Sequence, residues 1–475
     1  MEEMLLKIVT KINEYLSNYM LLFLLIGIGL FYTIRTRFVQ VRCFGEGFKK
    51  VFGKFTLRGG KQEGGLSSFQ ALATAIAAQV GTGNIVGASG AILVGGPGAI
   101  FWMWIIAFFG MATIYAEAVL AQETRVVDQD GSVHGGPVYY IRKAFTGGFG
   151  KFLAGFFAVA AILALGFMGS MVQSNSIAGT MNTAFGIDGW VIGLIVAAIA
   201  AFIFLGGIQR IASVTEKIVP IMALLFIVGC LVILGIRYQY ILPTFKMIFV
   251  SAFDADAVIG GGIGAIIVAV TQGAKRGLFS NEAGMGSTPH AHAMAKVKKP
   301  HDQGVAAMVG VFIDTFIVLT LTALVVISTM YMKDGEFVKF FGENFADRIA
   351  LTVGEGGLEI DKNNLMQAGF SSVAGESFGS VFVAVCLLFF AFSTIISWNF
   401  FGKINVEYLF GKKAAIVYSV IAVGFIFMGS VLQNDLVWEL TDMFNNLMVL
   451  PNVIALACLS GIVAKAANKQ NKLKK

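Results

Sequence analysis

A run of small and polar residues interrupts an apolar stretch in the first quarter of the chain. The run Ala77-Ala78-Gln79-Val80-Gly81-Thr82-Gly83-Asn84-Ile85 contains two glycines, a threonine and an asparagine, which are poor helix formers. A helix broken there would leave carbonyl groups free on one half-helix and N–H groups free on the other. Free N–H groups bind a carboxylate, and free carbonyls bind a cation or an ammonium group. The run therefore predicts a site for a zwitterion.

Two other interpretations of these glycines were considered. Gly81 and Gly83 could instead form a close helix-packing face, because small residues let helices approach one another, and the sequence leaves this open. The glycines of a dinucleotide-binding fold are excluded, because the spacing to Gly87 is one residue too long and no soluble sheet is predicted.

Two adjacent hydroxyl residues lie in a later apolar stretch, Phe392-Ser393-Thr394-Ile395-Ile396-Ser397-Trp398. Hydroxyls in apolar helices commonly bond to their own backbone. Hard cations, however, prefer oxygen ligands, and hydroxyls with backbone carbonyls make a neutral cage that suits sodium. A proton would need a titratable group instead, and no acid flanks this pair.

Several other polar residues fall inside apolar stretches, where they are costly unless they face protein or water. Asp314 is a candidate for a proton relay or a structural ion pair. Gln173 could bond a substrate or a neighbouring helix. Glu117 falls close to one end of its stretch and is expected to be solvated, and no acid is expected beside the break at 81–84.

A second break is expected within residues 257–283. Gly260-Gly261-Gly262-Ile263-Gly264 and Thr271-Gln272-Gly273 are both candidates, and the second is favoured because it lies nearer the middle of the stretch. Lys275 and Arg276 follow it and must face protein or a water-filled vestibule.

The composition indicates how these residues are positioned. The 475-residue chain is 57% hydrophobic and 13% charged, against roughly 25% charged in soluble domains. Apolar runs of about 20 residues recur, and lipid allows such runs only as helices. The composition and the apolar runs therefore predict an all-α polytopic membrane protein that lies in the lipid bilayer. The net charge of +7 lies mostly in short loops, so it is not taken to indicate a nucleic-acid partner.

Loop charge orients the expected spans. Residues 35–62 carry eight basic residues and one acid, and the tail 465–475 carries five lysines and no acid, whereas 333–376 carries eight acids and four bases. The positive-inside rule then places the N-terminus outside and the C-terminus in the cytoplasm. An odd number of spans is required, and we count eleven: 16–34, 66–95, 98–123, 151–180, 190–207, 211–235, 257–283, 304–332, 377–402, 414–432 and 436–464.

The spans divide into one extra helix and two sets of five. We expect residues 1–475 to form a single transporter domain, with 16–34 as the extra helix and 66–235 and 257–464 as the two repeats. An odd number of spans in each repeat inverts the second relative to the first. Inverted repeats of this kind place a substrate site at mid-membrane, between discontinuous first helices.

Enzyme and metal chemistry find little support. No nucleophile and base occur in a recognisable set, and no cofactor is expected. The cysteines show neither metal-ligand spacing nor a disulfide framework, and the histidines fall in loops without a credible metal site. These residues are Cys43, Cys230, Cys386 and Cys458, and His134, His290, His292 and His301.

The chain resembles the alanine or glycine:cation symporters. The resemblance rests on Gly81-Thr82-Gly83-Asn84-Ile85-Val86-Gly87, Gly95-Gly96-Pro97-Gly98-Ala99-Ile100-Phe101-Trp102-Met103-Trp104, Gly277-Leu278-Phe279-Ser280-Asn281-Glu282-Ala283-Gly284 and Phe392-Ser393-Thr394-Ile395-Ile396-Ser397-Trp398. Together they span nearly the whole chain. The family implies a leucine-transporter-like fold, ten helices preceded by one extra helix, and a gating loop at 333–376.

The resemblance also implies roles for individual residues. The sodium ligands would be the carbonyls of Ala77, Val80 and Phe390 with the hydroxyls of Ser393 and Thr394. Thr82, Gly83 and Asn84 would bind the substrate carboxylate, and Gln173, Phe279 and Trp398 would line the cavity.

We therefore expect a sodium-coupled symporter of a small neutral amino acid such as alanine or glycine. A proton-coupled transporter of the same fold is the first alternative, and an ion channel or a membrane enzyme is a more distant one. The sequence leaves open the choice between alanine and glycine, the stereoselectivity, the stoichiometry and the oligomeric state.

Overall fold

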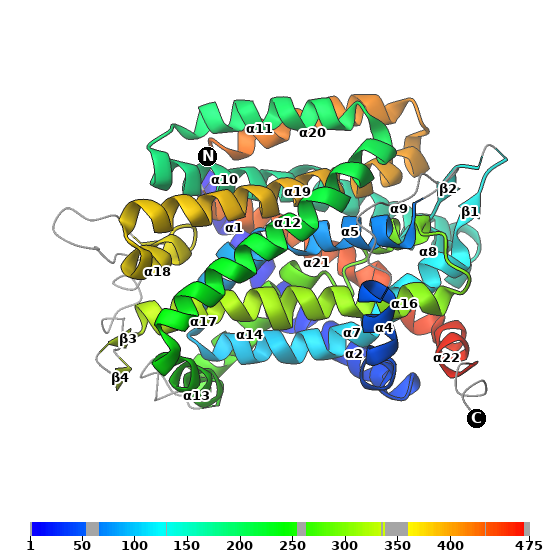
Figure 1. Cartoon of the computed structure of the whole chain (residues 1–475). Coiled ribbons are helices and arrows are strands. Elements are labelled where there is room, and N and C mark those ends of the chain that lie inside the picture. The colour runs from blue at the N-terminus through cyan, green and yellow to red at the C-terminus, as the bar shows by residue number, and fades with distance from the viewer. Residues whose placement is uncertain are drawn as a thin grey trace.

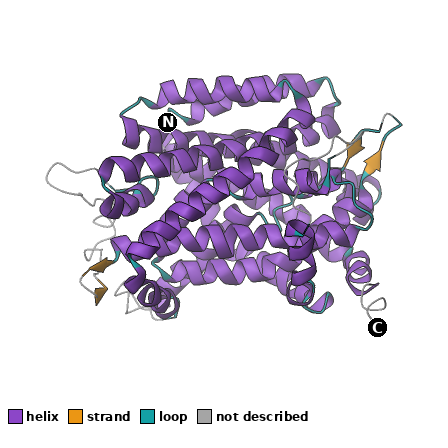
Figure 2. Cartoon of the chain, in the orientation of Figure 1, coloured by secondary structure: helices purple, strands orange, loops and turns teal. Residues whose placement is uncertain are grey.

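The computed structural model is a bundle of helices with two small hairpins (Figure 2). It describes residues 2–53, 66–129, 131–253, 263–333, 336–337, 360–432 and 434–469. Within those ranges, six helical segments are long and apolar enough to cross a membrane, a bent pair adds a seventh, and three shorter apolar helices accompany them. The predicted all-helical membrane architecture is confirmed, whereas the count of eleven spans stays a prediction. Gly260, Gly261 and Gly262, and most of the expected gating loop, lie outside the described residues.

The first part of the chain starts with one long helical run and contains the first broken helix. Its elements are α1 (Glu2–Tyr15), η1 (Leu16–Leu21), α2 (Leu22–Arg35), α3 (Val39–Arg42), α4 (Phe44–Phe52), α5 (Ser68–Gln79), η2 (Gly83–Gly87), α6 (Ala88–Gly95), α7 (Gly98–Thr124), β1 (Val126–Val127), β2 (Val133–His134), α8 (Pro137–Ala144), α9 (Gly147–Ala161), η3 (Ile162–Gly169), α10 (Ser170–Phe185), α11 (Gly189–Phe204), α12 (Gly207–Ile236), η4 (Tyr238–Tyr240) and α13 (Ile241–Ser251).

The second part starts with the long helix α14. Its elements are α14 (Ile263–Asn281), α15 (Pro289–Met294), α16 (Pro300–Val311), η5 (Phe312–Leu319), α17 (Thr320–Met330), β3 (Met332–Lys333), β4 (Glu336–Phe337), α18 (Leu365–Ala374), α19 (Glu376–Phe410), α20 (Ala414–Gly429), α21 (Asn434–Cys458) and α22 (Ser460–Lys469). The two hairpins pair antiparallel, with Val126 opposite His134 and Met332 opposite Phe337.

The two ends of the bundle carry different segments (Figure 1). The β1–β2 hairpin, α22 and the C-terminus lie at one end, and α18, β3 and β4 lie at the other, with the N-terminus on that side of the middle. α11 and α20 lie side by side along one edge, and α12 crosses the bundle obliquely. The basic tail and the acidic 333–376 segment, as far as it is described, are therefore held apart.

The first helix break occurs where the glycines predict it. α5 begins with a capping box, in which the Ser67 hydroxyl accepts from the Gln70 N–H and the Gln70 side chain accepts from the Ser67 N–H, each at 3.1 Å. The helix ends at Gln79, and the segment from Gly83 continues at 42° to it. The lower helix propensity of glycine and asparagine thus coincides with a real break.

The second break lies further along than expected, so the prediction of a break at Thr271-Gln272-Gly273 is wrong. α14 runs unbroken through that segment to Asn281. A Cβ on Gly273 would lie 2.7 Å from the carbonyl oxygen of Ala99 on α7, so this glycine serves close helix packing. The chain leaves the helix at Glu282, whose φ is +58°, and passes through two positive-φ glycines, Gly284 and Gly286, before Pro289 starts α15.

Apolar side chains are found on the outer surface of the bundle as well as in its core. Phe202 on α11, Leu224 on α12 and Val420 on α20 are each about two-thirds exposed, at 67%, 66% and 68%. Exposed apolar surface on this scale is unfavourable in water and suits a lipid environment. The largest buried side chains include Trp398 and Trp438, which lie near the breaks.

Candidate substrate and cation sites

The N–H groups at the first break are capped by side-chain amides. The N–H of Gly81 donates to Oδ1 of Asn84 at 3.0 Å, and the N–H of Thr82 donates to Oε1 of Gln173 on α10 at 3.1 Å. All four residues lie in the buried interior. These N–H groups point at oxygen acceptors, so a carboxylate oxygen could take the same place.

The two glycines of the break also allow close packing. A Cβ on Gly81 would lie 2.5 Å from Oγ1 of Thr394, and a Cβ on Gly83 would lie 2.9 Å from Cα of Ser280. The packing interpretation and the break interpretation therefore both hold at this position, because the break brings its backbone against α14 and α19.

An oxygen cluster lies beside the break, between α5 and α19. The hydroxyl of Thr394 donates to the Ala77 carbonyl at 2.8 Å and to the Phe390 carbonyl at 3.1 Å. The hydroxyl of Ser393 lies 2.9 Å from the Phe390 carbonyl and 3.5 Å from the Ala77 carbonyl. Both hydroxyls are fully buried. The oxygens of four of the five expected sodium ligands therefore lie close together. The fifth expected ligand is the carbonyl of Val80, which directly precedes Gly81 in the same break.

Asp314, in η5, lies directly beside the break. The expectation that no acid lies there is therefore wrong. Its Oδ1 accepts from Nδ2 of Asn84 at 2.6 Å, and its carboxylate also accepts from the hydroxyls of Ser280 and Thr315, at 3.0 Å and 2.7 Å. Asp314 is fully buried. Among the interactions of the described residues, Asp314 accepts hydrogen bonds from neutral donors and forms no ion pair, so the second of its two candidate roles, a structural ion pair, is not seen there.

Aromatic rings cover the same region. The ring of Phe279 lies edge-on to Trp398 with centroids 5.8 Å apart, and 4.9 Å from the ring of Trp438. Nε1 of Trp398 donates to Oε1 of Glu282 at 2.5 Å, and the hydroxyl of Ser287 donates to the same carboxylate. Glu282 therefore ties the second break to α19. This role of Glu282 was not predicted from the sequence.

Glu117 on α7 is buried rather than solvated, which corrects the sequence expectation. Its carboxylate accepts from the N–H groups of Gly284 and Gly286 at 3.1 Å and 3.0 Å and from Nδ2 of Asn452 at 2.7 Å. Buried carboxylates need such donors. Glu117 therefore stabilises the second break by satisfying its free N–H groups.

Lys275 and Arg276 face protein. Nζ of Lys275 lies 2.8 Å from Asp442 and 3.2 Å from Glu439, and the Arg276 guanidinium lies 3.2 Å from Asp442. The guanidinium also lies over the ring of Trp438, 4.7 Å from its centroid. The four charges join α14 to α21 close to the aromatic rings.

Nearly all of the predicted site residues lie at the two breaks or on the parts of α10 and α19 that contact the breaks. The structure adds Ser280, Glu282 and Asp314. A sequence signal for Glu282 exists, because two glycines and a proline follow it within seven residues. No such signal places Asp314 beside Asn84, since the two are 230 residues apart.

The arrangement of the helices places the chain in one structural class, the leucine-transporter-like fold. The solved structure of MhsT in complex with L-phenylalanine matches 87% of this chain and 98% of its own, with a TM-score of 0.57 and 14% sequence identity. At that identity the likeness shows the fold alone.

The sequence comparisons give the family within that class. The chain belongs to the sodium:alanine symporter family, whose model matches residues 2–475. The sodium/alanine symporter AgcS of Methanococcus maripaludis is 39% identical over 469 residues, covering 98% of both chains. GlnT of Bacillus subtilis, named as a probable sodium/glutamine symporter, is 36% identical over 480 residues, covering 100% of this chain and 92% of its own. The protein is therefore a polytopic cell-membrane transporter and not an enzyme.

Proposed function

We propose that the protein imports a small neutral amino acid such as alanine or glycine together with sodium, by alternating access. The observation that carries the proposal is the adjacency of the oxygen cluster and the break. Oγ1 of Thr394 donates to the carbonyl of Ala77 and would lie 2.5 Å from a Cβ on Gly81. A cation in the cluster and a zwitterion at the break would therefore be held by the same few residues of backbone.

The ligands assigned to sodium are all neutral oxygens. They come from the carbonyls of Ala77, Val80 and Phe390 and the hydroxyls of Ser393 and Thr394. Sodium bound there would tie α5 to α19 and fix the bend that α5 makes with η2. By linkage, a bound sodium that orders the break raises the affinity for substrate, and substrate raises the affinity for sodium by the same factor.

The substrate is assigned to the break itself. Its carboxylate would replace the side-chain oxygens that now accept from Gly81 and Thr82, with Thr82, Gly83 and Asn84 as the binding segment and Gln173 beside it. Phe279 and Trp398 would close the cavity around the side chain. Because both glycines are packed without spare room, a short side chain fits the proposal best.

The relatives support this assignment at two levels. AgcS is named for sodium and alanine, which agrees with the proposed substrate and coupling ion. GlnT is named for glutamine, so the family scaffold is associated with more than one side-chain size. Glutamine is therefore included among the competitors in the test.

Proton coupling is the second candidate, and one observation favours it. Asp314 is a fully buried carboxyl within 2.6 Å of the break residue Asn84, and buried acids inside membrane spans occur in proton pathways. Its three neutral donors favour a fixed carboxylate that orients Asn84, so sodium coupling remains the first proposal.

The orientation is also a proposal. The described part of the lysine-rich tail, in α22, and the described part of the acidic segment, which includes β4 and α18, lie toward opposite ends of the bundle (Figure 1). With the positive-inside rule, this arrangement supports a cytoplasmic C-terminus and an outer N-terminus. We also propose two inverted repeats at 66–235 and 257–464 after the extra helix.

The test of the substrate site is competition for labelled alanine uptake in proteoliposomes with an inward sodium gradient. Unlabelled alanine and glycine should compete, whereas alanine methyl ester, which lacks the carboxylate charge, should not. Leucine, phenylalanine and glutamine should compete weakly. Equal inhibition by alanine and its methyl ester would overturn the carboxylate site at Thr82 to Asn84.

A further inference from the structure

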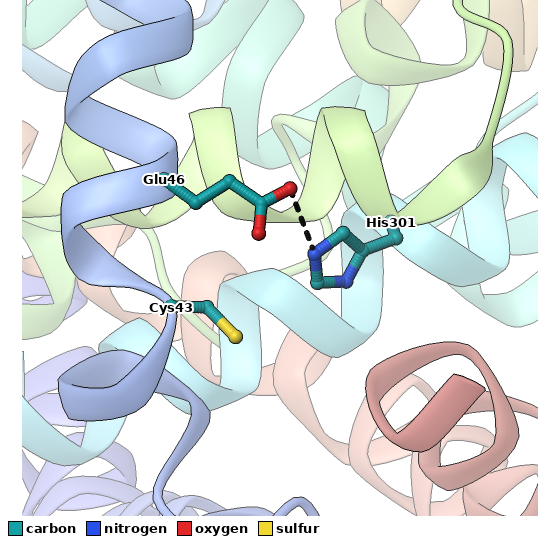
Figure 3. Close-up of side chains that lie close together, drawn as sticks. All are labelled: Cys43, Glu46 and His301. Carbon is teal, nitrogen blue, oxygen red and sulfur yellow. Dashed lines mark ion pairs between the residues drawn. The ribbon is translucent and has the colours of Figure 1, made fainter. Parts of the chain in front are cut away.

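Three side chains of types that can bind a metal ion come together outside the substrate site described above. Cys43, just before α4, Glu46 on α4 and His301 at the start of α16 each offer one ligand atom, and these atoms lie within 4.8 Å of one another. Figure 3 shows the three side chains converging from two separate segments. Cys43 and His301 are each 3% exposed. Neither cysteine spacing nor histidine spacing predicts this cluster, because His301 comes from a distant part of the chain.

The imidazole of His301 is oriented as a metal ligand would be. Its Nδ1 lies 2.7 Å from the hydroxyl oxygen of Tyr115, and its Nε2 points toward Glu46, 3.5 Å from Oε1 (Figure 3). Among the described residues, this longer contact with Glu46 is the one that Nε2 makes. If Nδ1–H donates to Tyr115, the lone pair of Nε2 faces the cluster, and an outer hydrogen bond of this kind commonly fixes a metal-binding histidine.

The distances suit a tetrahedral ion. Zinc bonds of about 2.0 to 2.3 Å to nitrogen, oxygen and sulfur place neighbouring ligand atoms roughly 3.3 to 3.8 Å apart. The separation of 3.5 Å between Glu46 Oε1 and His301 Nε2 falls in that range. All three ligand atoms lie within 4.8 Å of one another, which exceeds the upper end of that range by at most about 1 Å.

The charges around the cluster permit a divalent cation. Lys50, on the same helix as Glu46, is paired with Asp302 at 2.9 Å. Arg42 donates to the carbonyls of Thr36 and Ala467, at 3.1 Å and 3.3 Å. Glu46 and a Cys43 thiolate would together supply two negative charges to the ion.

We propose that Cys43, Glu46 and His301 bind a borderline-soft divalent metal ion, best exemplified by Zn²⁺, with water as the fourth ligand. Thiolate, imidazole and carboxylate are the ligand types that zinc uses, and three protein ligands with one open position form a known zinc arrangement. The ion joins α4 to α16, against which α4 already packs so closely that a Cβ on Gly47 would lie 2.4 Å from the Val305 carbonyl oxygen.

The direct test uses full-length protein purified in detergent without a polyhistidine tag. One equivalent of Co²⁺ should give a near-ultraviolet thiolate-to-cobalt absorption band, and one equivalent of Zn²⁺ should abolish it. Competition with a chromophoric chelator then gives the zinc affinity. Absence of a thiolate band from the wild-type protein would overturn the proposal, and this readout needs no variant.

Variants assign the ligands. Cys43→Ser should remove the cobalt band, His301→Gln should weaken zinc binding at least tenfold, and Tyr115→Phe should weaken it about tenfold through the outer hydrogen bond. Cys458→Ser is the matched control, because Cys458 is exposed and outside the cluster, and it should bind zinc as the wild type does. Loss of the band in Cys458→Ser with retention in Cys43→Ser would place the metal elsewhere and contradict the assignment.

Discussion

Nδ2 of Asn84 donates to Oδ1 of Asp314 at 2.6 Å, which joins the broken helix of the first half of the chain to η5 of the second. The same amide group accepts from the Gly81 N–H through Oδ1. Asp314 therefore fixes which way the Asn84 amide faces, and Asn84 in turn fixes the N–H of Gly81. On this view Asp314 is a positioning residue for the substrate site.

Replacing this acid should damage transport without changing its driving ion. In Asp314→Asn an NH₂ group replaces one of the two carboxylate oxygens. The side chain then has one oxygen fewer to accept the hydrogen bonds from Asn84, Ser280 and Thr315. Loss of hydrogen bonds to a charged group costs about 1.5–3 kcal/mol each, so alanine uptake should fall at least about tenfold, or 1.4 kcal/mol. The measurement is initial uptake rate at several pH values per folded transporter.

Asp435→Asn provides the control, because Asp435 is 74% exposed and pairs only with Lys362 among the ion pairs of the described residues. It should transport like the wild type. A wild type driven by a pH gradient, combined with an Asp314→Asn variant that has lost this dependence, would favour the proton-coupled alternative instead.

The oxygen cluster can be tested by removing its two hydroxyls. Ser393→Ala with Thr394→Ala leaves only carbonyls among the five proposed ligands, so half-maximal uptake should require at least tenfold more sodium, or uptake should cease. Ser419→Ala is the matched control, because Ser419 bonds to its own helix at Ala415, 2.9 Å away, on α20. An unchanged sodium dependence in a well-folded double variant would contradict the proposed sodium site.

Two glycines of the same short segment should respond differently to a methyl group. A Cβ on Gly83 meets Ser280 Cα at 2.9 Å, whereas the nearest atom to a Cβ on Gly87 lies at 3.8 Å. Overpacking typically costs about 1–3 kcal/mol. Gly83→Ala should therefore lose most uptake and Gly87→Ala should retain it, both measured at equal amounts of folded protein. Equal activity in the two variants would show that the close approach is not needed.

The topology can be tested at the two ends of one helix. Ser377, at the start of α19, and Lys413, three residues after the end of α19, are both exposed. In a Cys458→Ser background, a membrane-impermeant thiol reagent applied to intact cells should label Ser377→Cys and leave Lys413→Cys unlabelled until the cells are opened. The reverse pattern would invert the proposed orientation.

The sequence predicted the features that depend on local chemistry. The glycines, threonine and asparagine at 81–84 have low helix propensity, and the chain does break there. The membrane class followed from composition and from the length of the apolar runs. Most of the proposed site residues on α5, η2, α14 and α19 belong to stretches that are continuous in the chain, whereas Gln173 on α10 was a single polar residue in an apolar stretch.

The features that the sequence did not predict depend on contacts between distant segments. Thr271-Gln272-Gly273 resembles a break locally, but packing against α7 keeps it helical. Glu117 is buried because Gly284, Gly286 and Asn452 supply donors from at least 167 residues away. The cluster of Cys43, Glu46 and His301 was not predicted for the same reason, because His301 is distant from the other two residues in the chain.

The central claim, sodium-driven import of a small amino acid, is tested most directly by imposing gradients separately on proteoliposomes. Labelled alanine should accumulate above its external concentration with an inward sodium gradient at equal pH on both sides. It should not accumulate with a pH gradient in sodium-free medium. Accumulation driven by the pH gradient alone, with no effect of sodium, would contradict the account.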